Sequence, residues 1–149
     1  MTKTRGGLLV AVIAAVALAV PTLVFAGGTS LTANLTGEQE VPAGSGAPNG
    51  EGTVDVDLKP KRKEVCFDLS FSGIAGKATS SAIFAGKKGE DGKTKVLFFD
   101  TPTQSPVSDC VKAKKKLLKK IKQKPRQYHV NVESKKYPEG AIRGQLKKG

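Results

Sequence analysis

The sequence contains few of the residues from which metal sites and proton-transfer sites are usually built. Among 149 residues there are one histidine, two cysteines and no tryptophan. A single histidine excludes a metal cage of several imidazoles, and any nucleophile–histidine arrangement would have to use His129. No G-x-S-x-G sequence accompanies it, and it lies in an alternating segment with Asn131 and Glu133. We therefore expect no enzymatic activity, no catalytic residues and no metal or other cofactor.

Long apolar runs are equally scarce, and the one that is present lies near the start of the chain. Leu8–Val20 is an unbroken apolar run of 13 residues, whereas a membrane-spanning helix needs about 20. Two basic residues precede the run, a proline ends it, and Val24–Ala26 offers the small residues of a cleavage site. The pattern predicts a signal peptide over residues 1–26 and a secreted mature chain over residues 27–149. An uncleaved membrane anchor is the alternative.

Export determines how the two cysteines are interpreted. Cys66 and Cys110 are 44 residues apart, and both belong to the expected mature chain. In an oxidising compartment a single pair of cysteines most simply forms a disulfide. Closing that loop would stabilise the fold by about 4 kcal/mol in the chain-entropy model. A reactive thiol or a redox pair is the alternative, but the C-x-x-C spacing is absent.

The mature part consists of short segments in which apolar and polar residues alternate. Such a period of two is typical of half-buried strands. Turn residues rich in glycine and proline separate the segments, and Lys59–Lys63 predicts a hairpin turn. Because no helices intervene, we predict an all-β fold, an antiparallel Ig-like β-sandwich of the Greek-key type. The expected strands cover residues 31–36, 53–58, 65–71, 96–99, 128–133 and 141–146.

One segment departs from this pattern. Val111–Gln123 combines helix-forming residues with a narrow apolar stripe, and Pro125 follows it, which predicts one short basic α-helix. The expected mature chain has 23 basic residues, and nine of them lie between Val111 and Arg126 without an acidic residue among them. The candidate anion-binding residues are Lys112, Lys114, Lys115, Lys116, Lys119, Lys120, Lys122, Lys124 and Arg126.

This concentration of charge has three interpretations. The segment is the solvated face of a structural helix, with its apolar stripe packed inward. Alternatively, it makes electrostatic contact with an exterior polyanion such as anionic lipid, a cell-wall polymer or an acidic polysaccharide. Nucleic acid is disfavoured, because 20 of the 23 basic residues are lysines and the run has no aromatic residue for base stacking.

Three further stretches together carry a family resemblance. They are Leu35–Pro42, Val65–Ile74 and Tyr137–Leu146. In this order and spacing they resemble the CHRD domain, a module named from chordin and common in secreted bacterial proteins. The resemblance covers about residues 31–146 and implies a compact, mostly antiparallel β-sandwich. The family's biochemical role is poorly defined, although in chordin such domains belong to an extracellular protein that sequesters growth factors. The residues that we expect to form a structural motif are Tyr137, Pro138, Gly140, Arg143 and Gly144.

Within this motif Arg143 has two interpretations. It is an anion-binding guanidinium, or it is a partly buried group that hydrogen-bonds carbonyls or a carboxylate. Glu40 and Glu139 are candidate partners for the second role. We favour the structural role, because a motif in the final strand more often fixes a fold than binds a variable ligand.

The chain also departs from the family at positions that would suit a metal. Many bacterial members carry a His-x-His pair in a middle strand and a further histidine after a Tyr-Val-Asn-Val stretch. The corresponding residues here are Ala82, Phe84 and Glu133. None of them offers an imidazole, so the sequence does not support a transition-metal activity of the kind those histidines would suit.

We therefore expect a secreted, monomeric, non-enzymatic CHRD module with an extracellular or envelope-associated binding or structural role. Its expected activity is salt-dependent attachment to anionic surface polymers or lipid through the basic segment. Two alternatives come from other classes. The first is a degenerate member of a metal- or redox-linked extracellular β-sandwich enzyme class. The second is a domain that binds an extracellular protein through loops such as Pro42–Gly52.

Overall fold

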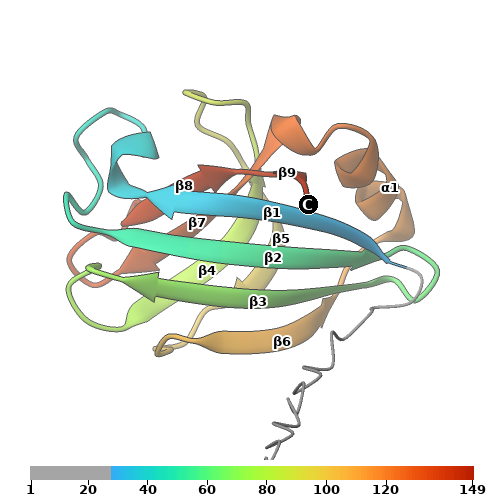
Figure 1. Ribbon diagram of the computed structural model, residues 1–149, viewed down its shortest axis with the longest axis horizontal. Coiled ribbons are helices and arrows are strands. Elements are labelled where there is room, and N and C mark those ends of the chain that lie inside the picture. Colours follow the sequence, from blue (N-terminus) through green and yellow to red (C-terminus); the bar gives the residue numbers. More distant parts are fainter. Residues whose placement is uncertain (1–27) are drawn as a thin grey trace, which may run out of the picture.

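The computed structural model describes residues 28–149, so the predicted signal peptide over residues 1–26 lies outside the described residues. The described part contains nine strands, one α-helix and two short 3-10 helices (Figure 1). No helix in residues 28–149 combines the length and the apolar character that crossing a membrane would require. The elements are β1 (Thr29–Thr36), η1 (Gly37–Gln39), β2 (Glu51–Lys59), β3 (Glu64–Ser72), β4 (Ala78–Ala85), β5 (Thr94–Phe99), β6 (Val107–Lys112), α1 (Lys115–Gln123), η2 (Pro125–Gln127), β7 (Tyr128–Ser134), β8 (Ile142–Gln145) and β9 (Lys147–Lys148).

All nine strands belong to one continuous sheet. Its order is β5-β4-β7-β8-β1-β2-β3-β6, with β9 paired to β1, and every pairing is antiparallel. The two outer strands, β5 and β6, approach each other, so the sheet curls into a nearly closed barrel. The predicted antiparallel all-β architecture is confirmed. The predicted division into the two sheets of an Ig-like sandwich is not, because β1 joins both halves through its pairing with β2 on one side and with β8 and β9 on the other.

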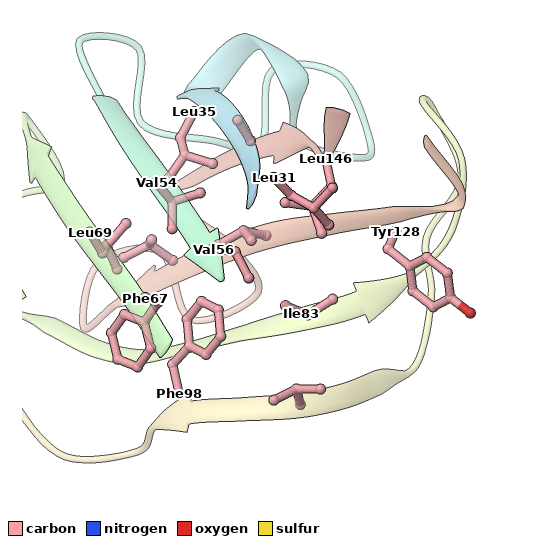
Figure 2. Packing of buried hydrophobic residues seen from close by; sticks show 14 of the residues in the cluster. Leu31, Leu35, Val54, Val56, Phe67, Leu69, Ile83, Phe98, Tyr128 and Leu146 are labelled. Carbon is pink, nitrogen blue, oxygen red and sulfur yellow. The ribbon is translucent and has the colours of Figure 1, made fainter. Parts of the chain in front are cut away.

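The core fills the inside of this barrel. Alternate residues of β1, β2 and β3 point inward, as the sequence pattern predicted, and the intervening residues point outward. Figure 2 shows the inward side chains of these strands facing those of β5 and β7. Phe67 of β3 and Phe98 of β5 stack with their ring centroids 4.1 Å apart. The two ends of the curled sheet are therefore held together by side-chain packing.

The hairpin predicted at Lys59–Lys63 is also confirmed. β2 and β3 pair over their full lengths, from Glu51 opposite Ser72 to Lys59 opposite Glu64. The register keeps the apolar residues of both strands on the inner face. It also fixes which outward residues lie side by side, and it places Asp57 opposite Cys66.

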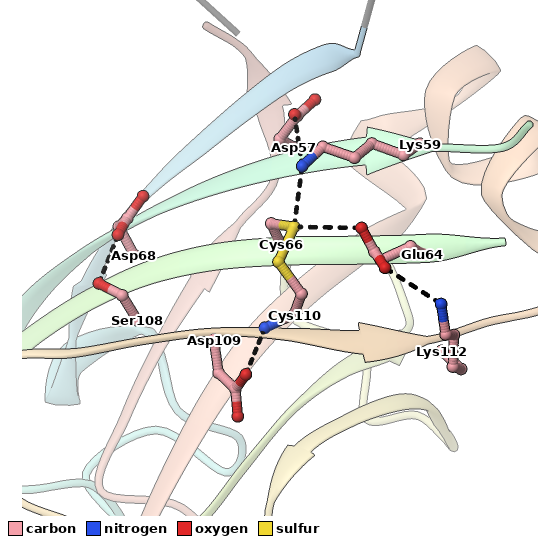
Figure 3. Close-up of a disulfide and its surroundings, with 9 residues drawn as sticks. All are labelled: Asp57, Lys59, Glu64, Cys66, Asp68, Ser108, Asp109, Cys110 and Lys112. Atoms are coloured by element: carbon pink, nitrogen blue, oxygen red, sulfur yellow. Dashed lines mark hydrogen bonds and ion pairs between the residues drawn. A yellow bond between two sulfur atoms is a disulfide. The ribbon is translucent and has the colours of Figure 1, made fainter. Parts of the chain in front are cut away.

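Cys66 and Cys110 lie directly opposite each other on β3 and β6 (Figure 3). Their sulfur atoms are at disulfide distance, 2.02 Å apart, as the pairing predicted. The bond lies on the outer face of the barrel, since Cys66 is partly buried and Cys110 is exposed. It joins the edge strand β6 covalently to its neighbour.

The helix begins later than predicted. The sequence pattern placed its start at Val111, but α1 begins at Lys115. Val111 and Lys112 instead extend β6, where they pair with Val65 and Glu64 of β3. Helix propensity was overridden here by the strand pairing next to the disulfide. The predicted inward stripe is present, because Leu118 and Ile121 are fully buried against the barrel.

Candidate anion-binding surface

The N-terminal end of the helix α1 has no favourable end groups. Its N-cap residue, Lys114, makes no side-chain capping hydrogen bond, and its first turn contains no acidic residue. Lys115 and Lys116 therefore lie at the positive end of the helix dipole, where cations are unfavourable. The buried Leu118 and Ile121 fix the helix in spite of this cost. Stability therefore does not explain why lysines occupy the first turn.

The structure brings the nine predicted basic residues to one end of the barrel. They extend from the last residue of β6 through α1 to η2, and all nine side chains are exposed. One of the nine is already neutralised, because Lys112 Nζ lies 3.1 Å from Glu64 Oε2 (Figure 3). This hydrogen bond lowers the pKa of the Glu64 carboxyl. The other eight form what we call the basic segment, Lys114–Arg126.

The structure adds basic residues that the sequence analysis did not connect with this segment. The turn Lys61–Lys63 lies beside the start of α1, because the amide of Ala113 donates to the carbonyl of Lys63 at 2.9 Å. All three residues of this turn are exposed and basic. The sequence alone predicts a charged turn at these residues. Only the pairing of β3 with β6 in the structure places that turn beside the helix.

A second group of cations surrounds Arg126. Lys147 and Lys148 of β9, together with Lys87 and Lys88 of the β4–β5 loop, line the surface next to η2. The sequence contained no local signal for this grouping, because these three segments meet only through the pairing of β7 with β4 and with β8.

Acidic residues gather on a different face. Asp55, Asp57 and Asp68 project outward from the wall formed by β2 and β3, and Asp55 is paired directly with Asp68 (Figure 3 shows Asp57 and Asp68). Lys59 Nζ lies 3.6 Å from Asp57 Oδ2, and the Ser108 hydroxyl donates to Asp68. The structure thus separates an acidic wall from the basic end.

Arg143 of the predicted motif does not belong to the exposed basic surface. It is 2% exposed, and its Nη2 donates to the carbonyls of Lys87 at 2.9 Å and Glu90 at 2.6 Å. The guanidinium thereby holds the β4–β5 loop against β8. The hydrogen-bond acceptors are carbonyls, as one of the two interpretations proposed, and they come from a loop that the sequence analysis did not name.

The two glycines of the motif lie where neighbouring atoms come so close that there is no room for a side chain. A Cβ on Gly144 would lie 2.2 Å from the Asn34 carbonyl of β1. Gly140 has a φ of +146°, and a Cβ there would lie 2.4 Å from Glu40 Oε2. Tyr137 closes the preceding turn through mutual backbone hydrogen bonds with Ser134, and Pro138 follows on the surface.

Comparison with known families agrees with this arrangement. The family model of the CHRD domain matches residues 31–146. The chain belongs to the CHRD domain family. No curated protein and no solved structure matches it. The matched residues coincide with the range that the three sequence stretches predicted, and they include β1 from Leu31 onward and all of β2 to β8.

In this CHRD domain the single histidine is enclosed. His129 of β7 is 1% exposed, its Nδ1 lies 3.3 Å from the Gly86 carbonyl, and its ring stacks on Phe84 with centroids 5.5 Å apart. Burial lowers the pKa of His129 to about 4, and the charge of Arg143 acts in the same direction. The imidazole is therefore neutral at physiological pH and is packed between neighbours.

The positions at which the resemblance implies histidines lie on the paired strands β4 and β7. Ala82 and Phe84 of β4 are paired with Asn131 and His129 of β7. Glu133, two residues beyond Asn131, has a pKa raised by burial. Within residues 28–149 the one cluster of three potential metal-ligating side chains is Glu64, Cys66 and Cys110, and its two sulfurs are bonded to each other.

The interior of the CHRD domain also contains a buried carboxyl group, that of Glu40. Glu40 is 4% exposed and accepts a hydrogen bond from Asn131 Nδ2 at 3.3 Å. Burial raises its pKa to about 7, although the nearby Arg143 acts against this shift. Glu40 Oε1 and Asn131 Oδ1 are buried and have no hydrogen-bond partner among the described residues. Sequence reasoning considered Glu40 only as a partner of Arg143.

Proposed function

We propose that this CHRD domain is a secreted, non-enzymatic module that attaches to an anionic polymer at an exterior surface through its basic end. One observation carries the proposal: eight exposed cations of the basic segment lie beside the exposed turn Lys61–Lys63 at one end of the barrel. Export is part of the proposal, and the signal-like pattern of residues 1–26 supports it.

The physical basis of attachment is long-range electrostatic attraction. Lysine side chains are flexible point charges that remain hydrated, so they attract a polyanion without demanding one geometry. Near an anionic surface each contributes about 1 kcal/mol, and the attraction decreases within a Debye length of about 10 Å at 0.1 M salt. Binding should therefore be strong at low salt and weak at high salt.

A polymer fits this surface better than a lipid bilayer. Leu118 and Ile121 of the apolar stripe on α1 are fully buried in the barrel and Leu117 is partly buried, so the helix presents mainly charge to its surroundings. Among residues 28–149 the exposed large hydrophobic residue is Leu97 on β5. A stable membrane anchor needs apolar insertion in addition to charge.

A matched pair of charge-reversal variants tests the proposal. The helix variant carries Lys116→Glu, Lys119→Glu and Lys120→Glu on α1. The control variant carries Lys77→Glu, Lys135→Glu and Lys136→Glu, which are exposed residues at the opposite end of β4 and β7. Both variants lose the same net charge, and glutamate is a good helix former, so α1 is retained.

Retention of the purified protein on immobilised anionic polymer is then measured across a salt series. We expect wild type and control variant to be released at similar salt concentrations, and the helix variant to be released at a much lower one. Equal retention of all three proteins, or release that does not respond to salt, would contradict attachment through the basic end.

A further inference from the structure

Two adjacent grooves flank Arg126. One has a volume of about 510 Å³ and lies between Gln123–Gln127 and the two lysines of β9. The other has a volume of about 420 Å³ and lies between η2, β9 and the β4–β5 loop. The grooves share Arg126 and Lys147, so they lie side by side on the same surface.

The backbone around the grooves is fixed by hydrogen bonds. Gln145 Nε2 lies 2.8–2.9 Å from the carbonyls of Gly86, Arg126 and Tyr128, so one amide connects the loop, η2 and β7. On the same side of the molecule, Arg143 holds the carbonyls of Lys87 and Glu90. The backbone carbonyls of Lys87 and Arg126 are thus held by side-chain hydrogen bonds, and β9, which carries Lys147 and Lys148, is paired with β1.

The lining has a distinct composition. It contains six cations, no acidic residue and no aromatic residue. Glutamine side chains lie among the cations, and Pro125 and Leu146 provide small apolar surfaces. The cations are Lys87, Lys88, Lys124, Arg126, Lys147 and Lys148.

We propose that the paired grooves bind a segment of a linear acidic polysaccharide, with a carboxylate held by Arg126. This inference rests on the proposed function and assigns its polymer a chemical class. The planar guanidinium fork matches a carboxylate in two hydrogen bonds, and the lysines on both sides attract the following carboxylates. Amide side chains such as Gln123 and Gln127 suit sugar hydroxyls.

The same features disfavour other polyanions. Single-stranded nucleic acid is usually held by bases stacked on aromatic side chains, and the groove lining has none. A bilayer surface is flat on the scale of the molecule and cannot enter a groove. The basic segment on α1 then attracts the polymer from a distance, and the grooves select among polymers.

The test separates the two roles. The probe is a hexagalacturonate, and its binding to the protein purified after expression of the full chain is measured by calorimetry. The groove variant, Arg126→Lys, keeps the charge and removes the fork. We expect it to bind the hexamer about tenfold more weakly, because a bidentate contact is lost while the charge is kept. Retention of wild type on anionic polymer through the salt series is measured separately, so that a failure of the proposed function is seen independently of the groove.

A second groove variant, Lys147→Gln, removes one charge shared by the two grooves and should also weaken hexamer binding. Both replaced side chains are exposed, so the fold is retained. Unchanged hexamer affinity in both variants would overturn the groove inference and leave the proposed function standing. Wild-type protein that is not retained on any anionic polymer would instead refute the proposed function. Tighter binding of a single-stranded oligonucleotide or of phosphatidylglycerol vesicles than of the hexamer would overturn the assignment to a polysaccharide.

Discussion

Glu40 and His129 are buried titratable side chains that respond to pH in opposite directions. The folded-state pKa of Glu40 is raised from 4.5 to about 7. The protonated Glu40 therefore stabilises the folded state fully below pH 4.5, and this stabilisation is lost as pH rises towards 7. The pKa of His129 is lowered from 6.5 to about 4, so folding loses stability as pH falls from 6.5 towards 4. Between about pH 4.5 and 6.5 the two effects offset each other.

Replacing Glu40 by glutamine should remove one of these effects. A glutamine amide would keep the contact with Asn131 and would offer a donor to the orphaned Asn131 Oδ1. Relative to wild type, Glu40→Gln should gain stability as pH rises from 5 to 8, by at most about 3 kcal/mol. Urea unfolding of both proteins at several pH values measures this difference, with the exposed Glu38→Gln as control. Parallel stability curves for wild type and Glu40→Gln would contradict the shifted pKa.

Arg143 should be one of the most sensitive residues in the domain. Arg143→Met would remove the side-chain donor to the carbonyls of Lys87 and Glu90, leaving the Lys87 carbonyl only its bond from the Glu90 amide, and would leave Glu40 without its nearby cation. Breaking such a buried charged contact typically costs about 3–5 kcal/mol. We expect a lower melting temperature and faster tryptic cleavage after Lys87 and Lys88 in the released loop. The exposed Arg126→Met is the control, and equal effects of the two substitutions would show that the contacts of Arg143 carry no special stability.

The role of an individual residue could be predicted from the sequence where a single property of that residue determines its role. The pairing of Cys66 with Cys110 followed from the number of cysteines and the expected compartment. The contact between Glu40 and Asn131 did not follow, because the two residues are 91 positions apart and meet only through the sheet order. Arg143 hydrogen-bonds carbonyls, as its structural interpretation proposed, but these carbonyls belong to a hairpin loop whose position the sequence does not specify.

Among the secondary-structure elements, the strands whose sequences alternate or form an apolar run were predicted, whereas β4 and β6 were not. β1, β2 and β3 alternate clearly and were found close to their true bounds. β4 was not recognised from its pattern, because Ser81, Ala82 and Ile83 are buried in succession and alternation is lost. β6 is an edge strand with mostly exposed side chains, so its pattern contains little hydrophobic signal.

The attachment of β6 should depend on the disulfide. Replacing both cysteines, as in Cys66→Ser with Cys110→Ser, removes a link that closes a separation of 44 residues. The chain-entropy model gives a loss of about 4 kcal/mol, which corresponds to a melting temperature lower by roughly 10–20 °C for a domain of this size. Thermal unfolding of the double variant and of wild type measures it, and wild type with a reductant should match the variant. A melting temperature that neither treatment changes would show that packing alone holds β6.

At the scale of the whole molecule, charges from distant segments act together. The sequence predicted that the charge is local to one segment, but the turn Lys61–Lys63 joins it through the hydrogen bond to Ala113. The closure of one sheet into a barrel could not be predicted from strand patterns, because both a barrel and a sandwich bury one face of every strand.

The turn should therefore contribute to attachment although it is about 50 residues away from the helix in sequence. Reversing Lys61 and Lys63 to glutamate should lower the salt concentration that releases the protein from anionic polymer. Reversing Lys135 and Lys136, which lie at the far end of β7, should change it little. A larger effect from the second pair would show that net charge, and not its position, determines retention.

The curled sheet has two free edges, and only one of them is covalently fastened. β6 is bonded to β3 by the disulfide, whereas β5 is held by its pairing with β4 and by buried side chains such as Phe98. Partial unfolding should therefore begin at β5 and carry the β4–β5 loop with it. Native-state hydrogen exchange should show the amides of β5 opening at lower free energy than those of β1 in the middle of the sheet. Such an opening would remove Lys87 and Lys88 from the groove while the basic helix stays in place, so a brief local fluctuation would release a bound polymer without unfolding the domain.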